Sequence, residues 1–170
     1  MSPPRIQVPP NCDLTLGMVC VDKSVPGTTV WRARADERFS NPAGIIQGGF
    51  LGAICDSAMG ASALTYARDR KVFVRNAEMK VSFLAPVAPE HVLECVATVI
   101  SGGRSAAFVE AELADIGPVG SLSMRTGPTG EGPTDVGAGA GESRRVVAKA
   151  SSTYLYTERQ AEPDTATAPG

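Results

Sequence analysis

Polar and apolar residues alternate in short segments along much of this chain, with the two-residue period of β-strands. Residues 18–22 and 28–36 are two such segments, and Val25-Pro26-Gly27 between them has the composition of a turn. The pattern predicts two short strands joined at this turn.

One segment, from Gly49 to Ala67, lacks this alternation. It consists of small and apolar residues around a single carboxylate, Asp56, and is predicted to be one long helix that begins at Gly48-Gly49. A membrane span is the alternative interpretation. An aspartate at the bilayer centre costs about 2.5–3.5 kcal/mol, and Gly, Ala, Ser and Thr offset little of this cost. A helix that is apolar on every side and enclosed by a soluble fold fits better.

A second run of strands follows the helix. Val72–Phe83 is predicted to be one long strand, and His91–Ser101 and Arg104–Asp115 are predicted to form a hairpin across the two-residue turn Gly102-Gly103. Strand character returns at Arg145–Tyr156, which we expect to pair with residues 104–115. Strands, one central helix and then antiparallel strands predict an α+β fold rather than repeated βαβ units.

The 170 residues are expected to form a single domain over residues 17–157. Residues 1–16 and 158–170 are predicted to be a flexible N-terminal segment and a disordered tail. Residues 117–143 are rich in Gly and Pro and are predicted to be a disordered insertion in a hairpin loop, because they cannot bury enough apolar surface. The alternative is that residues 120–125 form the terminal strand.

Composition excludes several function classes. A formal net charge of −2 and the absence of a basic helix argue against nucleic-acid binding. The N-terminus lacks the apolar core of a signal peptide, and the four cysteines have neither metal-type spacing nor a dense disulfide framework. We therefore expect a cytoplasmic protein with reduced thiols and no metal site.

Asp56 is the leading candidate for chemistry. An ionised carboxylate in an apolar helix is costly to desolvate unless something pairs with it or uses it. Gly48 lies in the first helical turn, where free N–H groups and the positive end of the helix dipole can polarise a carbonyl oxygen. The eight-residue separation is about 12 Å along the axis, too far for both to act on one carbon. In an antiparallel pair of helices across a dimer, however, Asp56 can face Gly48 of the partner subunit.

The helix face that carries Asp56 is otherwise made of glycine. Gly48, Gly52 and Gly60 share the four-residue spacing with Asp56, so backbone or ligand can approach this face closely. Tight packing of the helix on the sheet is an alternative reason for these glycines, and the two interpretations are compatible.

These features resemble a known family. Asn41, the Gly-Gly helix start seven residues later, Asp56 and a strand ending in Phe83-Leu84-Ala85-Pro86 are similar to the pattern of hotdog-fold acyl-CoA thioesterases, in the phenylacetyl-CoA thioesterase-like (PaaI-like) branch. The resemblance covers roughly residues 30–115 and 145–156. It implies a curved antiparallel sheet wrapped around one long central helix. It also implies a homodimer, or a dimer of dimers, with paired active sites.

The resemblance further implies hydrolysis of an acyl- or aryl-CoA thioester to the free acid and CoA, with no cofactor. The Gly48 N–H would polarise the thioester carbonyl, and Asp56 would act as general base or nucleophile. Asn41 would orient water or substrate through its amide. Because Asn is favoured in a turn before Pro42, a purely structural role for Asn41 stays open.

Other positions are expected to bind substrate. Gln47 stands where many relatives have His, and it can form hydrogen bonds but cannot titrate. Gly49 completes the glycine pair, and Asn76 aligns with a polar position on the strand after the helix, counted back from Pro86. Arg104 stands where the family often contacts CoA, although an ordinary solvated arginine is the alternative.

Two other function classes stay open. A non-catalytic module that binds acyl-CoA or an apolar ligand would keep the same fold. A hotdog dehydratase is less favoured because it normally needs a titrating His beside its acid, and the one histidine, His91, follows a probable turn. Cys55, adjacent to Asp56, is predicted to be a small core residue rather than a nucleophile.

Overall fold

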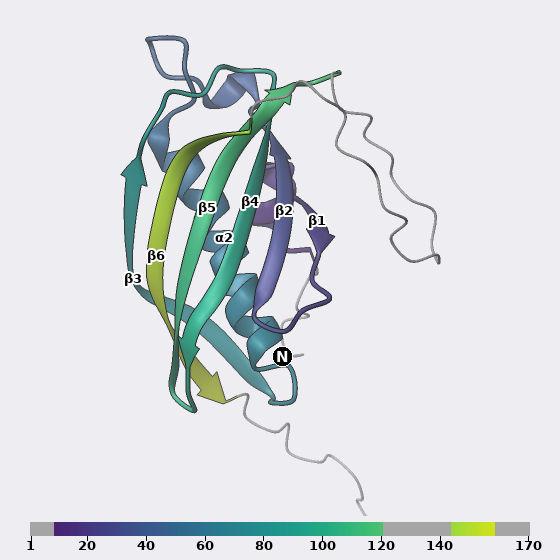
Figure 1. Cartoon of the computed structure of the whole chain (residues 1–170), viewed down its shortest axis with the longest axis vertical. Helices are drawn as coiled ribbons and strands as arrows, with labels where there is room; N and C mark the ends of the chain where they lie inside the picture. The colour runs from purple at the N-terminus through teal and green to yellow at the C-terminus, as the bar shows by residue number, and fades with distance from the viewer. Residues whose placement is uncertain (1–8, 121–143, 159–170) are drawn as a thin grey trace, which may run out of the picture.

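The computed structural model describes residues 9–120 and 144–158 (Figure 1). In chain order the elements are α1 (Asn11–Thr15), β1 (Val19–Asp22), β2 (Thr28–Arg34), the 3₁₀ helix η1 (Glu37–Phe39), α2 (Gly48–Tyr66), β3 (Val72–Phe83), β4 (His91–Gly102), β5 (Ala106–Pro118) and β6 (Arg145–Glu158).

The strands form one antiparallel sheet in the order β1-β2-β4-β5-β6-β3. The sheet curves around α2, with β1 and β3 at its two edges (Figure 1). The last strand of the chain, β6, lies between β5 and β3, so it pairs on both sides. The expected α+β arrangement of one helix and a curved antiparallel sheet is confirmed.

Several element boundaries match the sequence prediction. The helix begins at Gly48 and β3 spans Val72–Phe83, both as predicted. The strand at 145–156 pairs with β5, also as predicted. In the part of the chain that the structure describes, no helix combines the length and the apolar character needed to cross a membrane.

The connection between β4 and β5 differs from the prediction. β4 includes Gly102 and β5 begins at Ala106, so three residues, not two, link the strands. The Gly103 N–H donates to the Ala106 carbonyl at 2.9 Å. Arg104, expected to begin the second strand, therefore lies in the connection.

Two predicted flexible segments contain ordered structure in their described parts. β5 continues to Pro118, which pairs with His91, and the Val119 N–H donates to the Glu90 carbonyl at 2.7 Å. The start predicted for the insertion, residue 117, therefore falls within a strand. Residues 11–15 of the N-terminal segment form α1. The remaining residues assigned to flexible segments, 1–8, 121–143 and 159–170, lie outside the described residues, as does most of the alternative strand at 120–125.

The core lies between α2 and the inner face of the sheet. Met59 on α2 and Leu93 and Leu113 on the sheet are among its largest buried side chains. Two polar side chains in this core bond each other, since the Thr29 and Ser62 hydroxyl oxygens lie 2.8 Å apart. The Ser62 hydroxyl also lies 3.0 Å from the Ala97 carbonyl oxygen, which accepts a hydrogen bond from it. The buried hydroxyls therefore tie α2 to β2 and β4 at little desolvation cost.

The glycine face of α2 packs against β3 and β6. A Cβ added to Gly48 would lie 3.0 Å from Cζ of Phe83, and one added to Gly52 would lie 3.8 Å from Cγ2 of Val81. At Gly60 the nearest atom would be Cε1 of Tyr154, at 3.4 Å. The face that carries Asp56 is therefore turned toward β3 and β6, and the tight-packing interpretation applies most strongly at Gly48.

A β-bulge in β3 determines which of its side chains face α2. Asn76 pairs with Tyr154 but Glu78 pairs with Thr153, so one extra residue enters β3 between them. The two-residue alternation changes phase at this point. Asn76 points toward the helix before the bulge, and Val81 does so after it.

The contact between α2 and the β4–β5 connection can be tested with two adjacent glycines. A Cβ at Gly102 would lie 2.4 Å from Cε1 of Tyr66, whose hydroxyl donates to the Gly102 carbonyl at 3.2 Å, whereas a Cβ at Gly103 meets no atom within 4 Å. Gly102→Ala should lower the free energy of unfolding by about 1–3 kcal/mol, because the Tyr66 ring has to move. Gly103→Ala is the matched control. Equal denaturation midpoints for the two variants would contradict this packing.

Candidate active site

Asp56 lies half-buried in the middle of α2 with its carboxylate fixed on one side. Its Oδ1 accepts hydrogen bonds from Asn76 Nδ2 at 2.6 Å and from the Tyr154 hydroxyl at 2.5 Å. Its Oδ2 has no hydrogen-bond partner among the described residues. The carboxylate is therefore held through one of its two oxygens.

Asn76 is itself oriented by a third side chain. The Ser152 hydroxyl lies 2.9 Å from Asn76 Oδ1 and 2.7 Å from the Glu78 carbonyl oxygen. With its oxygen toward Ser152, the amide presents its nitrogen to Asp56, so both contacts agree on the amide orientation. The structure thus places Asn76, expected from sequence to bind substrate, beside the candidate catalytic residue.

Tyr154 stands behind the carboxylate in the core and is 3% exposed. Burial raises the pKa of Tyr154 well above its usual value, and the hydrogen bond to Asp56 raises this pKa further. The hydroxyl therefore keeps its proton and acts as a donor. Sequence reasoning missed Tyr154 and Ser152. Their inward positions two residues apart on a predicted strand were the available signal, because a buried tyrosine hydroxyl usually needs a partner.

The N-terminus of α2 forms a second group of predicted residues. Gln47 is the N-cap residue; its side chain is exposed and makes no capping hydrogen bond. The N–H groups of Gly48 and Gly49 begin the helix and lack acceptors among the described residues. The Phe83 ring packs on Gly48. This end of the helix presents free donors next to an aromatic surface.

Asn41 lies in the loop before this helix end. Its Oδ1 accepts from the Ala43 N–H at 2.9 Å and from the Ile45 N–H at 3.4 Å, and its own N–H donates to the Ile45 carbonyl at 2.8 Å. These contacts favour the structural interpretation, in which Asn41 shapes the turn that leads into α2. Its amide nitrogen is left for any contact with substrate.

Arg104 lies at the opposite end of α2. It is exposed in the β4–β5 connection, and its carbonyl accepts from Arg70 Nη2 at 2.6 Å. The single chain therefore does not bring the seven predicted site residues together. Asp56 and Asn76 are in contact, the residues around Gly48 lie two helical turns away, and Arg104 is remote from both groups.

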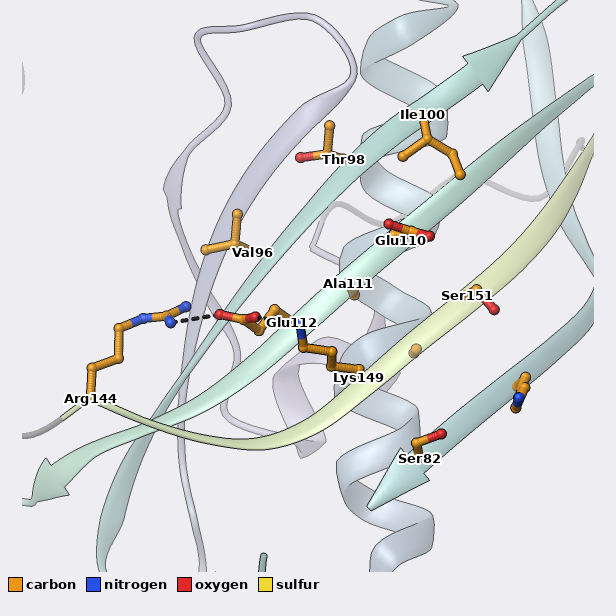
Figure 2. A pocket seen from close by; sticks show the side chains of 12 residues that line it. Ser82, Val96, Thr98, Ile100, Glu110, Ala111, Glu112, Arg144, Lys149 and Ser151 are labelled. Atoms are coloured by element: carbon orange, nitrogen blue, oxygen red, sulfur yellow. Dashed lines mark hydrogen bonds and ion pairs between the residues drawn. The ribbon is translucent and has the colours of Figure 1, made fainter. Parts of the chain in front are cut away.

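A hollow of about 590 Å³ lies elsewhere, on the outer face of the sheet (Figure 2). None of the predicted site residues lines it. Two of its three cations, Arg144 and Lys149, share the carboxylate of Glu112 at 2.6 Å and 3.2 Å. In Figure 2 α2 runs behind the sheet, so the hollow lies on the face of the sheet opposite the helix that carries Asp56. We do not assign the chemistry to this hollow.

His91 and Cys55 make contacts with other side chains. His91 Nδ1 lies 2.9 Å from Asp115 Oδ1, and Arg145 Nη2 lies 3.1 Å from Asp115 Oδ2. Cys55 is fully buried, and its hydrogen bond with Cys95, together with burial, raises the pKa of the Cys95 thiol well above its usual value. Cys55 is therefore a core residue, as predicted, and His91 pairs with Asp115 rather than with Asp56.

Asp115, His91 and Arg145 form a polar cluster that contributes to stability in a pH-dependent way. Burial alone would raise the pKa of Asp115, but hydrogen bonds from His91, the Gly117 N–H and Arg145 outweigh it and hold this pKa below its usual 3.8. A lowered folded-state pKa stabilises the protein above the unfolded-state pKa, and this contribution is lost as pH falls through the folded-state value.

At pH 7, Asp115→Asn should therefore lower the free energy of unfolding by about 2 kcal/mol, the scale of a hydrogen bond to a charged group. The deficit should shrink below about pH 4. Urea denaturation at pH 7 and pH 3.5 measures it, with Asp69→Asn, an exposed carboxylate after α2, as the control. A deficit that is independent of pH would contradict the assigned ionic role.

Comparisons with known proteins place this geometry in context. Residues 43–119 match the family model described as the Thioesterase superfamily. A thioesterase family protein from Silicibacter pomeroyi has a similar structure, with a TM-score of 0.68, 21% identity, and coverage of 89% of this chain and 93% of that chain. For the PaaI protein of the phenylacetic acid degradation operon of E. coli, the values are 0.65, 14%, 86% and 83%.

A variant of the phenylacetic acid degradation protein PaaI from Thermus thermophilus is similar as well, with a TM-score of 0.62, 18% identity, and coverage of 84% of this chain and 96% of that chain. No curated protein sequence matches the chain. At these identities the structural likeness establishes the fold. The resemblance to PaaI-like hotdog thioesterases and the hotdog fold are confirmed. The family match supports thioester hydrolysis as the general chemistry.

Proposed function

We propose that this chain, which has the hotdog fold and a thioesterase-superfamily segment, hydrolyses an acyl- or aryl-CoA thioester to the free acid and CoA without a cofactor. The observation that carries the proposal is the Asp56 carboxylate, whose Oδ1 is held by Asn76 and Tyr154 while its Oδ2 has no hydrogen-bond partner among the described residues. A carboxylate arranged in this way is suited to take a proton or to attack a carbon.

As a general base, Asp56 takes a proton from water while the water oxygen bonds to the thioester carbon. The C–S bond then breaks, and the departing CoA sulfur receives the proton from Asp56. As a nucleophile, Asp56 instead bonds to the carbonyl carbon, CoA leaves, and water hydrolyses the resulting anhydride. Both routes consume one water molecule and regenerate the carboxylate. Both place negative charge on the carbonyl oxygen, which a helix N–H can stabilise.

That N–H has to come from a second copy of the chain. Gly48 and Asp56 lie on the same straight helix about 12 Å apart. The edge strand β3 supports the pairing, because it is 12 residues long and exposed over most of its length. Met79, Phe83 and Leu84 leave apolar surface exposed along it. Pairing of two β3 edges would cover this surface and set two α2 helices antiparallel.

In such a homodimer, Asp56 of one subunit would face Gly48 of the partner subunit, and a dimer of dimers would contain two such pairs of sites. Gln47 and Gly49 would contact substrate beside the oxyanion, and the Asn41 amide nitrogen would contribute there. Arg104 would bind a CoA phosphate, which its exposed guanidinium suits. Phe83, packed on Gly48, favours an apolar or aromatic acyl group.

A binding module without hydrolysis is the second candidate, because the free donors at the start of α2 would also bind a thioester carbonyl. The open Oδ2 of Asp56 favours the enzyme, since a binding site gains nothing from an unpaired carboxylate oxygen next to a carbonyl. Release of free thiol from a panel of acyl- and aryl-CoA esters separates the two candidates.

The first functional prediction concerns Asp56. Asp56→Asn should lower kcat at least about 100-fold, a reduction typical of the loss of a general base. The asparagine side chain oxygen can still accept from Tyr154 and Asn76, so the fold should persist. Thiol release measures the rate, and circular dichroism measures folding. A wild-type rate in Asp56→Asn would contradict the catalytic role of Asp56. Tight binding of CoA esters by the wild type without turnover would favour the binding module.

The second functional prediction tests the shared site. Asp56→Asn subunits and Gly48→Val subunits should each be inactive, but mixing them should restore activity, because one of the two sites in a mixed dimer retains both groups. At statistical exchange about half of the dimers are mixed. Subunit exchange is verified separately by mass spectrometry of differently tagged chains. No recovery after verified exchange would mean that the site lies within one chain.

A further inference from the structure

We propose that Tyr154 is a positioning residue for the reaction: its hydroxyl fixes Oδ1 of Asp56 so that Oδ2 is the oxygen presented to water or thioester. The inference rests on the proposed function, because it concerns the same carboxylate. It adds a residue from the last strand of the chain that neither the family pattern in the sequence nor the helix geometry indicates.

The contact is short and enclosed. The Tyr154 hydroxyl lies 2.5 Å from Asp56 Oδ1 and 2.8 Å from the Asp56 carbonyl oxygen. A hydroxyl carries one proton, and the shorter contact to the charged acceptor is the stronger hydrogen bond. The Asp56 carbonyl oxygen is the alternative acceptor for the same proton, so the hydroxyl stays beside Asp56 with either acceptor. The Tyr154 hydroxyl thus contacts both the main chain and the side chain of Asp56.

Neighbouring groups fix the tyrosine in turn. Tyr154 pairs with Asn76 across β6 and β3, so the two donors to Oδ1 come from adjacent strands. The ring also lies against Gly60, one turn after Asp56, where an added Cβ would lie 3.4 Å from Cε1 of the ring. The ring is 3% exposed, so it cannot swing away from the carboxylate without opening the core.

This restraint matters because an aspartate carboxylate rotates readily about its terminal torsion. The terminal torsion of Asp is broad and roughly two-fold, so an unrestrained carboxylate exchanges its two oxygens. Because Asn76 and Tyr154 both donate to Oδ1, they favour the one rotation of the carboxylate that places Oδ1 against them. Loss of one donor leaves the Asn76 contact, which comes from an exposed side chain and holds the group less firmly. The reacting oxygen then spends less time in the productive geometry, which lowers kcat.

Tyr154 does not act as the base itself. Burial, followed by the contact with Asp56, raises the pKa of Tyr154, so the hydroxyl is protonated over the range in which the enzyme would work. Its hydroxyl contacts Oδ1 and the main-chain carbonyl of Asp56 rather than Oδ2. Its effect on the reaction therefore passes through the carboxylate.

The chain offers a matched control on the same strand. Tyr156, two residues further along β6, donates its hydroxyl to the Ala63 carbonyl of α2 at 3.0 Å. Tyr154→Phe and Tyr156→Phe each remove one tyrosine-to-helix hydrogen bond and keep the ring. Only the first removes a donor from the carboxylate. A merely structural role predicts the same kinetic effect for both variants.

With the acyl-CoA ester that the wild type hydrolyses fastest, Tyr154→Phe should lower kcat about 10-fold and leave KM within about two-fold, because binding groups are untouched. Tyr156→Phe should retain the wild-type kcat. Rates are expressed per folded subunit, because Tyr154→Phe removes a bond to a charged acceptor and should lower the denaturation midpoint more than Tyr156→Phe does. An unchanged kcat in Tyr154→Phe, an equal loss in both variants, or a change confined to KM would each overturn the proposal. Loss of activity in Asp56→Asn with a normal Tyr154→Phe would refute the positioning role alone, whereas a normal Asp56→Asn would refute the proposed function.

Discussion

The carboxylate of Asp56 imposes the constraint on which the rest of this structure depends. An ionised side chain in the middle of an apolar helix has to be given donors, or the helix cannot be enclosed by the sheet. Tyr154 and Asn76 supply these donors from β6 and β3. This requires the last strand of the chain to lie between β5 and β3, next to the strand that follows the helix. The order of the strands and the chemistry of the site are thus linked through one carboxylate oxygen.

The bulge in β3 reconciles this polar contact with an apolar core. Without it, a strand that turns Asn76 toward α2 would also turn Lys80 inward. One extra residue after Asn76 shifts the alternation, so that Val81 and Phe83 face the helix instead. Bulges commonly redirect side chains beside active sites. Here the bulge places a hydrogen-bond donor and an apolar packing surface on the same face of one strand.

Sequence patterns predicted the elements better than the contacts between them. The start of α2 and the bounds of β3 followed from local composition, and Asp56 was identified because a charge in an apolar helix is costly. Tyr154 was missed because its partner is 98 residues away in the chain. Periodicity shows which face a strand residue occupies but not what it meets there. The turn at Gly102 was misplaced for a similar reason, since its packing against Tyr66 is a long-range contact that keeps Gly102 within β4.

The separation of Gly48 and Asp56 along α2 is the reason why the proposed reaction site uses two chains. The donors at Gly48 need the first turn of a helix, because later N–H groups are used within the helix itself. The carboxylate needs donors from the sheet, and these strands reach α2 near its middle. A straight helix cannot satisfy both requirements at one carbon atom. Phe83 packs on Gly48 and ends the exposed edge strand, so the surface next to the helix start is also the surface that a second subunit would cover. In the proposed dimer, assembly and completion of the active site would be the same event.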